Sequence, residues 1–117
     1  MPANTMINIW AIEKHQRIRQ ALVLLATHLG ESHFIVDTDT QAADTGIYLR
    51  HKDDAKYRAY LYTTGQDENR YGLHLEFPDT QSTIAPMETY ENITLRSLVD
   101  ILSVHFDIAV IEDRGLL

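Results

Sequence analysis

The sequence predicts an α+β domain, a two-layer sandwich in which an N-terminal and a C-terminal helix pack on one face of an antiparallel β-meander of four to five strands. Three observations lead to this prediction. Apolar residues follow a helical period near both ends of the chain, residues alternate in character through its middle, and the segments between the alternating runs are too short for parallel crossovers. The length of 117 residues is typical of one domain, so residues 1–117 are expected to share one core, with residues 1–5 as a flexible leader.

The first helix is indicated over residues 11–29 by apolar residues that fall on one side. They recur at intervals of four, three and four, and they are Ile18, Leu22, Leu25 and Leu29. Gly30 follows the last of them and suits a left-handed cap, so the helix is expected to end there. His15 extends the same side and is therefore expected to be a hydrogen-bonded core histidine.

The middle of the chain has the patterns of β-strands. A short apolar run and three alternating runs rich in Tyr, Leu and Thr predict strands at residues 34–36, 46–50, 57–63 and 71–77. The connections are polar and carry turn residues, as in the Gly-Gln-Asp-Glu-Asn run at 65–69. A weaker strand is expected around residues 83–87, where Pro86 would confine it to a sheet edge.

The helical period returns after Asn92 and predicts the second helix. Its apolar side carries Leu95, Leu98, Val99, Leu102 and Phe106. Thr94 is the expected N-cap, and His105 falls in the last turn, where a cation interacts favourably with the helix dipole. Residues 108–111 are apolar and β-branched, which suits a last strand or a packed tail.

Alternation along the strands predicts a second, uncovered face of the sheet. Successive side chains of a strand point to opposite faces, so the leucines are expected beneath the helices and their neighbours on the other side. We call this outward set the Tyr/Arg face; it consists of Tyr48, Arg50, Arg58, Tyr60, Tyr62, His74 and Glu76. Tyrosine and arginine often supply the binding energy at protein interfaces, so the set is a predicted interaction face. Tyrosines also favour strands for packing reasons alone, and that alternative stays open.

Composition and charge narrow the classes of partner. The formal net charge of −7 opposes binding to phosphate backbones and anionic lipids, so direct nucleic-acid binding is not expected. The sequence has neither a secretory signal nor an apolar stretch long enough to span a bilayer, so no membrane partner is expected. The absence of cysteine fits a reducing compartment, and a cytoplasmic location is expected.

The sequence offers no catalytic residues, no metal site and no cofactor motif. None of the six histidines forms an i, i+4 pair, and no phosphate-binding glycine loop or nucleophile motif occurs. The polar segment at 37–41 begins like a calcium loop, but Ala42 stands where the sharp turn needs glycine. His74, which shares a face with Glu76, is the best acid/base candidate.

These observations favour a noncatalytic protein-interaction module of the binding, adaptor, immunity or chaperone type. It would bind a protein partner, or itself as a homodimer, through the Tyr/Arg face or through acidic loop tips such as residues 53–54 and 67–68. One alternative is a small-molecule-binding domain or enzyme with a pocket between sheet and helices, using His74, Glu76 and a tyrosine. Another is an acidic inhibitor that mimics nucleic acid, which requires the carboxylates to cluster on one surface.

Overall fold

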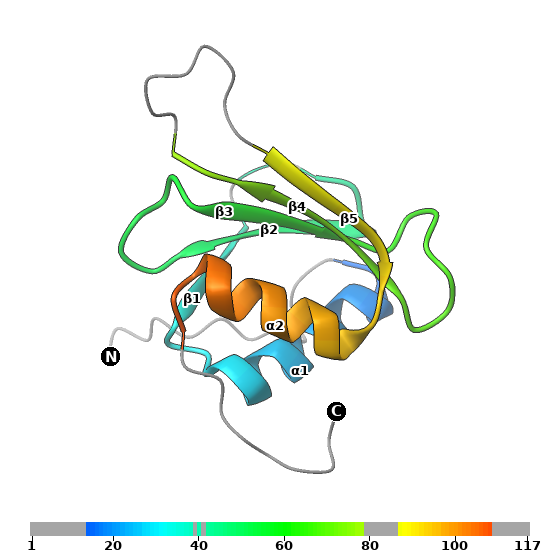
Figure 1. Cartoon of the computed structure of the whole chain (residues 1–117). Coiled ribbons are helices and arrows are strands. Elements are labelled where there is room, and N and C mark those ends of the chain that lie inside the picture. The colour runs from blue at the N-terminus through cyan, green and yellow to red at the C-terminus, as the bar shows by residue number, and fades with distance from the viewer. Residues whose placement is uncertain (1–13, 39, 41, 79–86, 109–117) are drawn as a thin grey trace.

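In the part of the chain that the structure describes, two helices and five strands follow one another in the predicted order of helix, strands and helix. The computed structural model describes residues 14–38, 40, 42–78 and 87–108. Its elements are α1 (Gln16–Leu29), β1 (Phe34–Asp37), β2 (Gly46–His51), β3 (Arg58–Tyr62), β4 (Tyr71–Glu76), β5 (Met87–Ile93) and α2 (Leu95–His105). The strands form one sheet in the order β1-β2-β3-β4-β5, and each pairs antiparallel with the next. Both helices lie on the same face of this sheet (Figure 1), which confirms the predicted α+β sandwich.

The core lies between the helices and the sheet and has the composition that the apolar patterns predict. The helices bury their apolar sides, which include Ile18, Leu22, Leu25, Leu29, Leu98, Val99 and Leu102. The strands bury alternate residues against them, namely Ile47, Leu49, Ala59, Leu61, Leu73 and Leu75. A one-residue slip in register would move all of these strand residues to the other face, so their burial fixes the pairing.

The first helix begins later than predicted, and this changes the role of one histidine. His15 is the N-cap of α1, and its Nδ1 atom accepts a hydrogen bond from the backbone N–H of Arg17 at 3.1 Å. Its side chain is exposed, so the expectation of a core histidine is wrong: the apolar period continues past the point where the helix starts. Residues 11–13 lie outside the described residues. The predicted end is confirmed, because Gly30 follows α1 with φ 89° and its N–H donates to the Ala26 carbonyl.

The fifth strand is longer and later than predicted. We expected a weak strand around 83–87, of which 83–86 lie outside the described residues, whereas β5 runs from Met87 to Ile93 at the sheet edge. A register shift interrupts its pairing with β4, and Asn92 has φ 54°. Tyr90 and Ile93 therefore both pack against the core although they are three residues apart. This irregularity removes the period of two on which strand prediction depends.

The second helix forms where the sequence predicts it. Thr94 is the N-cap, and its Oγ1 atom accepts a hydrogen bond from the Ser97 N–H at 3.2 Å. After the helix, Ile108 packs against the core outside any strand, and residues 109–111 of the predicted tail lie outside the described residues. Neither α1 nor α2 has the length and apolar character needed to cross a bilayer.

Candidate functional site

The Tyr/Arg face is formed by residues that the strand register brings side by side. Tyr48 pairs with Tyr60, and Tyr60 pairs with His74, so these three side chains form one row across β2, β3 and β4. Arg50, Arg58 and Glu76 form the next row in the same way. Tyr62 lies on β3 between Gly46 and Gly72. These positions alternate with the buried strand residues, so the predicted residues lie together on the sheet face opposite the helices. Figure 1 shows that both helices cover the other face.

An aromatic cluster occupies the centre of this face. The rings of Tyr48 and Tyr60 have centroids 4.8 Å apart, and those of Tyr60 and Tyr62 stack at 5.6 Å. The His74 ring meets Tyr62 edge-on at 5.0 Å. Aromatic pairs at such distances contribute about 0.5–1.5 kcal/mol each beyond the area that they bury. The cluster therefore ties three strands together as well as forming a surface.

Two glycines let the tyrosine rings lie flat on the sheet. A Cβ atom at Gly46 would overlap the Tyr60 side chain, and one at Gly72 would overlap the Tyr62 ring. Each ring therefore covers the backbone of a neighbouring strand, a position that only glycine leaves open. Sequence reasoning did not assign this role to the glycines, because it becomes visible only once the register is known.

Tyr62 is a packing residue of the face. Its side chain is only 8% exposed, and its hydroxyl donates a hydrogen bond to Oε2 of Glu91 on β5 at 3.0 Å. Burial raises the pKa of Tyr62 to about 12, and the hydrogen bond to Glu91 and the charge of that carboxylate act in the same direction. The other predicted members of the face are partly exposed, so any contact with a partner falls to them.

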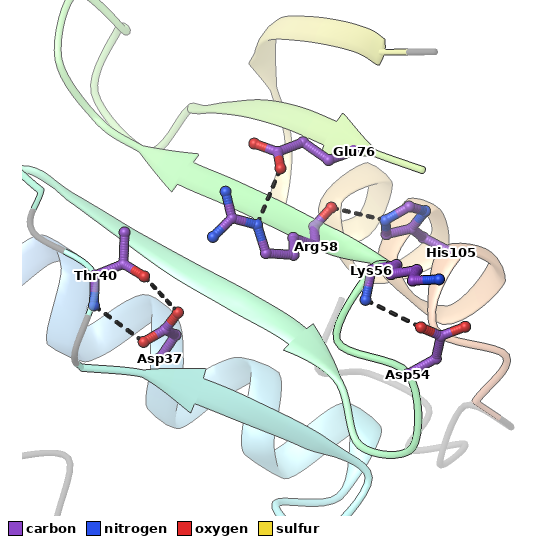
Figure 2. A network of polar contacts seen from close by, with 7 residues as sticks. All are labelled: Asp37, Thr40, Asp54, Lys56, Arg58, Glu76 and His105. Carbon is purple, nitrogen blue, oxygen red and sulfur yellow. Dashed lines mark hydrogen bonds and ion pairs between the residues drawn. The ribbon is translucent and has the colours of Figure 1, made fainter. Parts of the chain in front are cut away.

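Arg58 is held in place, whereas Arg50 is available. Arg58 Nε donates to Glu76 Oε1 at 2.9 Å (Figure 2), and its guanidinium lies 4.4 Å from the centroid of the Tyr48 ring. The hydrogen bond with Glu76 raises the pKa of Arg58. Both partners are about one third exposed, so the pair adds little stability and mainly fixes orientation. Arg50 forms no ion pair with any of the described residues.

His105 lies on the other side of β3 and is buried, contrary to its expected role as a cation at the helix end. Its Nε2 atom donates to the backbone carbonyl of Arg58 at 2.8 Å (Figure 2). Its ring packs against those of Tyr57, Phe77 and Phe106. Burial lowers the pKa of His105, although the backbone carbonyls of Arg58 and Glu76 oppose this effect. The neutral imidazole is therefore the native form.

The lowered pKa of His105 predicts a pH-dependent stability. The unfolded state, with a histidine pKa of about 6.5, binds more protons than the folded state, so stability is complete above that pH and falls as the pH drops below it. We expect His105→Phe to reduce the loss of unfolding free energy between neutral and mildly acidic pH, measured by urea denaturation. His15→Asn keeps an N-cap acceptor and serves as the control. Equal pH dependence in the His105 variant and the wild-type chain would contradict this account.

A cavity of about 500 Å³ lies between α2 and the sheet. His105, Tyr57 and Phe77 are among the residues that line it. His74 and Glu76 are not, because both lie on the opposite face of the sheet, so the predicted pocket would have to work without them. Sequence reasoning missed His105 as a cavity residue, since a histidine in a last helical turn is usually exposed.

The described residues give little support to a metal site or to an acidic binding surface. Within residues 14–38, 40, 42–78 and 87–108, no group of three or more potential ligand side chains is placed to hold a metal ion. Two of the acidic residues in turns use their carboxylates locally: Asp37 accepts hydrogen bonds from the backbone and hydroxyl of Thr40, and Asp54 accepts one from the Lys56 N–H (Figure 2). No protein-family model, curated protein or solved structure matches this chain.

Proposed function

We propose that this protein is a noncatalytic interaction module that binds another protein through the Tyr/Arg face. One observation carries the proposal: partly exposed tyrosine, arginine and histidine side chains form a continuous surface on the sheet face that neither helix covers (Figure 1). Interfaces are enriched in tyrosine and arginine, and truncating these residues commonly costs more binding energy than truncating others.

The face is also ordered before any partner arrives. Arg58 is oriented by Glu76 and Tyr48, and the Tyr60 ring rests over Gly46. Immobilising a long side chain on binding costs about 0.5–1.5 kcal/mol, so side chains that are already fixed reduce the cost of association. Arg50 lies in the same row without an ion pair among the described residues. The partner surface that fits best offers a carboxylate for Arg50 and apolar area for the tyrosines.

The acidic loop tips support the nucleic-acid-mimic alternative poorly. Asp53 and Asp54 lie in the connection between β2 and β3, whereas Asp67 and Glu68 lie in the connection between β3 and β4. Consecutive turns of a meander lie at opposite ends of its sheet, as the two hairpins do in Figure 1. The two groups therefore do not form one acidic surface, which a nucleic-acid mimic would need.

The experiment compares two charge reversals of equal size on different surfaces. Arg50→Glu changes the Tyr/Arg face, and Arg96→Glu changes an exposed position on α2. A partner is captured with the wild-type chain, purified, and titrated calorimetrically against each variant. We expect Arg50→Glu to weaken binding by about tenfold or more, which corresponds to about 1.4 kcal/mol, and Arg96→Glu to leave it unchanged.

Sedimentation velocity of the purified chain tests whether the partner is a second copy. A concentration-dependent dimer that Arg50→Glu abolishes would assign the face to self-association. Binding and association that are the same in Arg50→Glu, Tyr48→Ala and the wild-type chain would refute the proposed function. Tyr62 is not used in this test, because its buried position means that its loss would change folding as well as binding.

A further inference from the structure

The cavity between α2 and the sheet has the size and the walls of a small-molecule site. Its volume of about 500 Å³ lies within the range of about 300–1,000 Å³ that ligand pockets occupy. Aromatic side chains of Tyr57, Phe77 and Tyr90 face it from the strand side, and Ile101 and Val104 face it from α2. The walls are therefore mostly apolar, and they come from elements that the core already holds in place.

The aromatic walls are fixed by contacts with one another. The Tyr57 and Phe77 rings meet edge-on with centroids 6.4 Å apart, and the His105 ring lies 4.8 Å from Phe77. Edge-to-face contacts in this range stabilise one arrangement of the rings. A ligand that enters the cavity thus finds preformed aromatic surfaces, and the faces of such rings attract cations.

Among the described residues that line this cavity, the two charged ones are both acidic. Glu88 comes from β5 and Asp100 from α2, so they approach the cavity from its two sides. Tyr90 donates a hydrogen bond from its hydroxyl to Oε1 of Glu88 at 2.8 Å, which orients that carboxylate. None of the described lining residues is a lysine or an arginine. The cavity therefore favours a positive charge at its edge.

His105 contributes its ring, and not a hydrogen-bond acceptor, to the cavity wall. Its side chain is 7% exposed, its Nε2 atom donates to the Arg58 carbonyl, and its Nδ1 atom is buried.

From these features we propose that the cavity binds a small organic cation: an ammonium group joined to an aromatic or alkyl body. The apolar body fills the space between the rings and α2, and the ammonium group lies near the carboxylates of Glu88 and Asp100. This site is on the opposite side of the sheet from the Tyr/Arg face, so the two can be tested separately.

The experiment uses three probes that share one apolar body and differ in charge: 4-phenylbutylammonium, 4-phenylbutanol and 4-phenylbutanoate. Titrations into the ¹⁵N-labelled chain are followed by amide chemical shifts, which report both the site and the dissociation constant. We expect saturable shifts at Tyr90, Ile101 and Val104, with the ammonium probe binding about tenfold more tightly than the alcohol and the carboxylate binding weakest.

Variants of the charged residues at the edge of the cavity distinguish the contribution of charge to binding from that of shape. Glu88→Gln and Asp100→Asn are expected to weaken the ammonium probe by several fold each and to leave the alcohol unchanged. Glu68→Gln, at an exposed position in the connection between β3 and β4 at the other end of the sheet, is expected to change neither. Val104→Lys places a cation beside the site at a residue that is 82% exposed, so the variant is expected to fold and to lose the preference for ammonium. Failure of all three probes to saturate, equal affinity of the ammonium and alcohol probes, or shifts confined to the Tyr/Arg face would overturn the proposal.

Discussion

Gly72→Ala is expected to lower the free energy of unfolding by about 1–3 kcal/mol, the usual cost of forcing an extra carbon into a packed site. Glycine is normally the poorer residue in a strand, so without a specific contact the same change would be neutral or favourable. Here the new Cβ atom would overlap the Tyr62 ring. That ring is buried and hydrogen-bonded to Glu91, so it cannot move away without losing both interactions.

A double-mutant cycle with Tyr62 tests the cause. Once Tyr62→Ala has removed the ring, Gly72→Ala has nothing to displace, and we expect it to stabilise the chain by about 0.5–1 kcal/mol. Gly46→Ala is a second comparison: it meets the hydroxyl end of the half-buried Tyr60, which can shift, so a smaller loss is expected. Urea denaturation gives all of these values. A stabilising Gly72→Ala in the wild-type chain would show that the ring does not lie over this glycine.

His28→Leu is expected to raise the free energy of unfolding by about 1–3 kcal/mol, because it removes buried polar atoms that lack partners. His28 lies on the core side of α1 and is 1% exposed. Neither of its ring nitrogens has a hydrogen-bond partner among the described residues. A leucine is of similar size and leaves no polar group to desolvate, and it also has a higher helix propensity than histidine.

Thr27→Leu controls for the general effect of adding leucine to α1, since Thr27 is exposed. We expect that change to alter stability by no more than about 0.5 kcal/mol. Thermal and urea denaturation of both variants provide the comparison. A clear loss of stability in His28→Leu would mean that the imidazole makes a favourable interaction that leucine cannot replace.

The fold was predictable because apolar residues recur at regular intervals in the helices and strands that bury only one side. Leucines spaced for a helix define α1 and α2, and alternate apolar residues in β3 and β4 define the inner face of the sheet. The same alternation placed the Tyr/Arg face on the opposite side. Strand β5 was displaced in the prediction because its pairing with β4 is irregular, which leaves no clean alternation to detect.

Which residues belong to the Tyr/Arg face could be predicted, but how far each side chain is exposed to solvent could not. Alternation assigns a side chain to a face, but it does not say whether the ring stands up into solvent or lies down on a neighbouring strand. The Tyr62 ring packs flat on β4 because Gly72 is its cross-strand partner, and that pairing depends on the loop between β3 and β4. Paired Tyr and Gly positions in adjacent strands are the signal that would have revealed it.

The histidines show the same limit in the helices. A helical period gives the side of the helix on which a residue lies. It does not give the first residue of the helix, and it does not show how deeply the last turn is buried. His15 therefore became an exposed cap instead of a core residue. His105 became a buried neutral group, because Tyr57, Phe77 and Phe106 close around the end of α2.

The helices seal one face of the sheet and leave the other open, and single cysteines can report this because the chain contains no cysteine. Single cysteines placed at Leu49, which is fully buried, and at Arg50 report the two faces of β2, with Thr64→Cys as an exposed reference. We expect a thiol reagent to modify Arg50→Cys in the native state at a rate close to that of the reference, and to modify Leu49→Cys only as the chain unfolds. Rapid native-state modification of Leu49→Cys, or protection of Arg50→Cys, would contradict this arrangement.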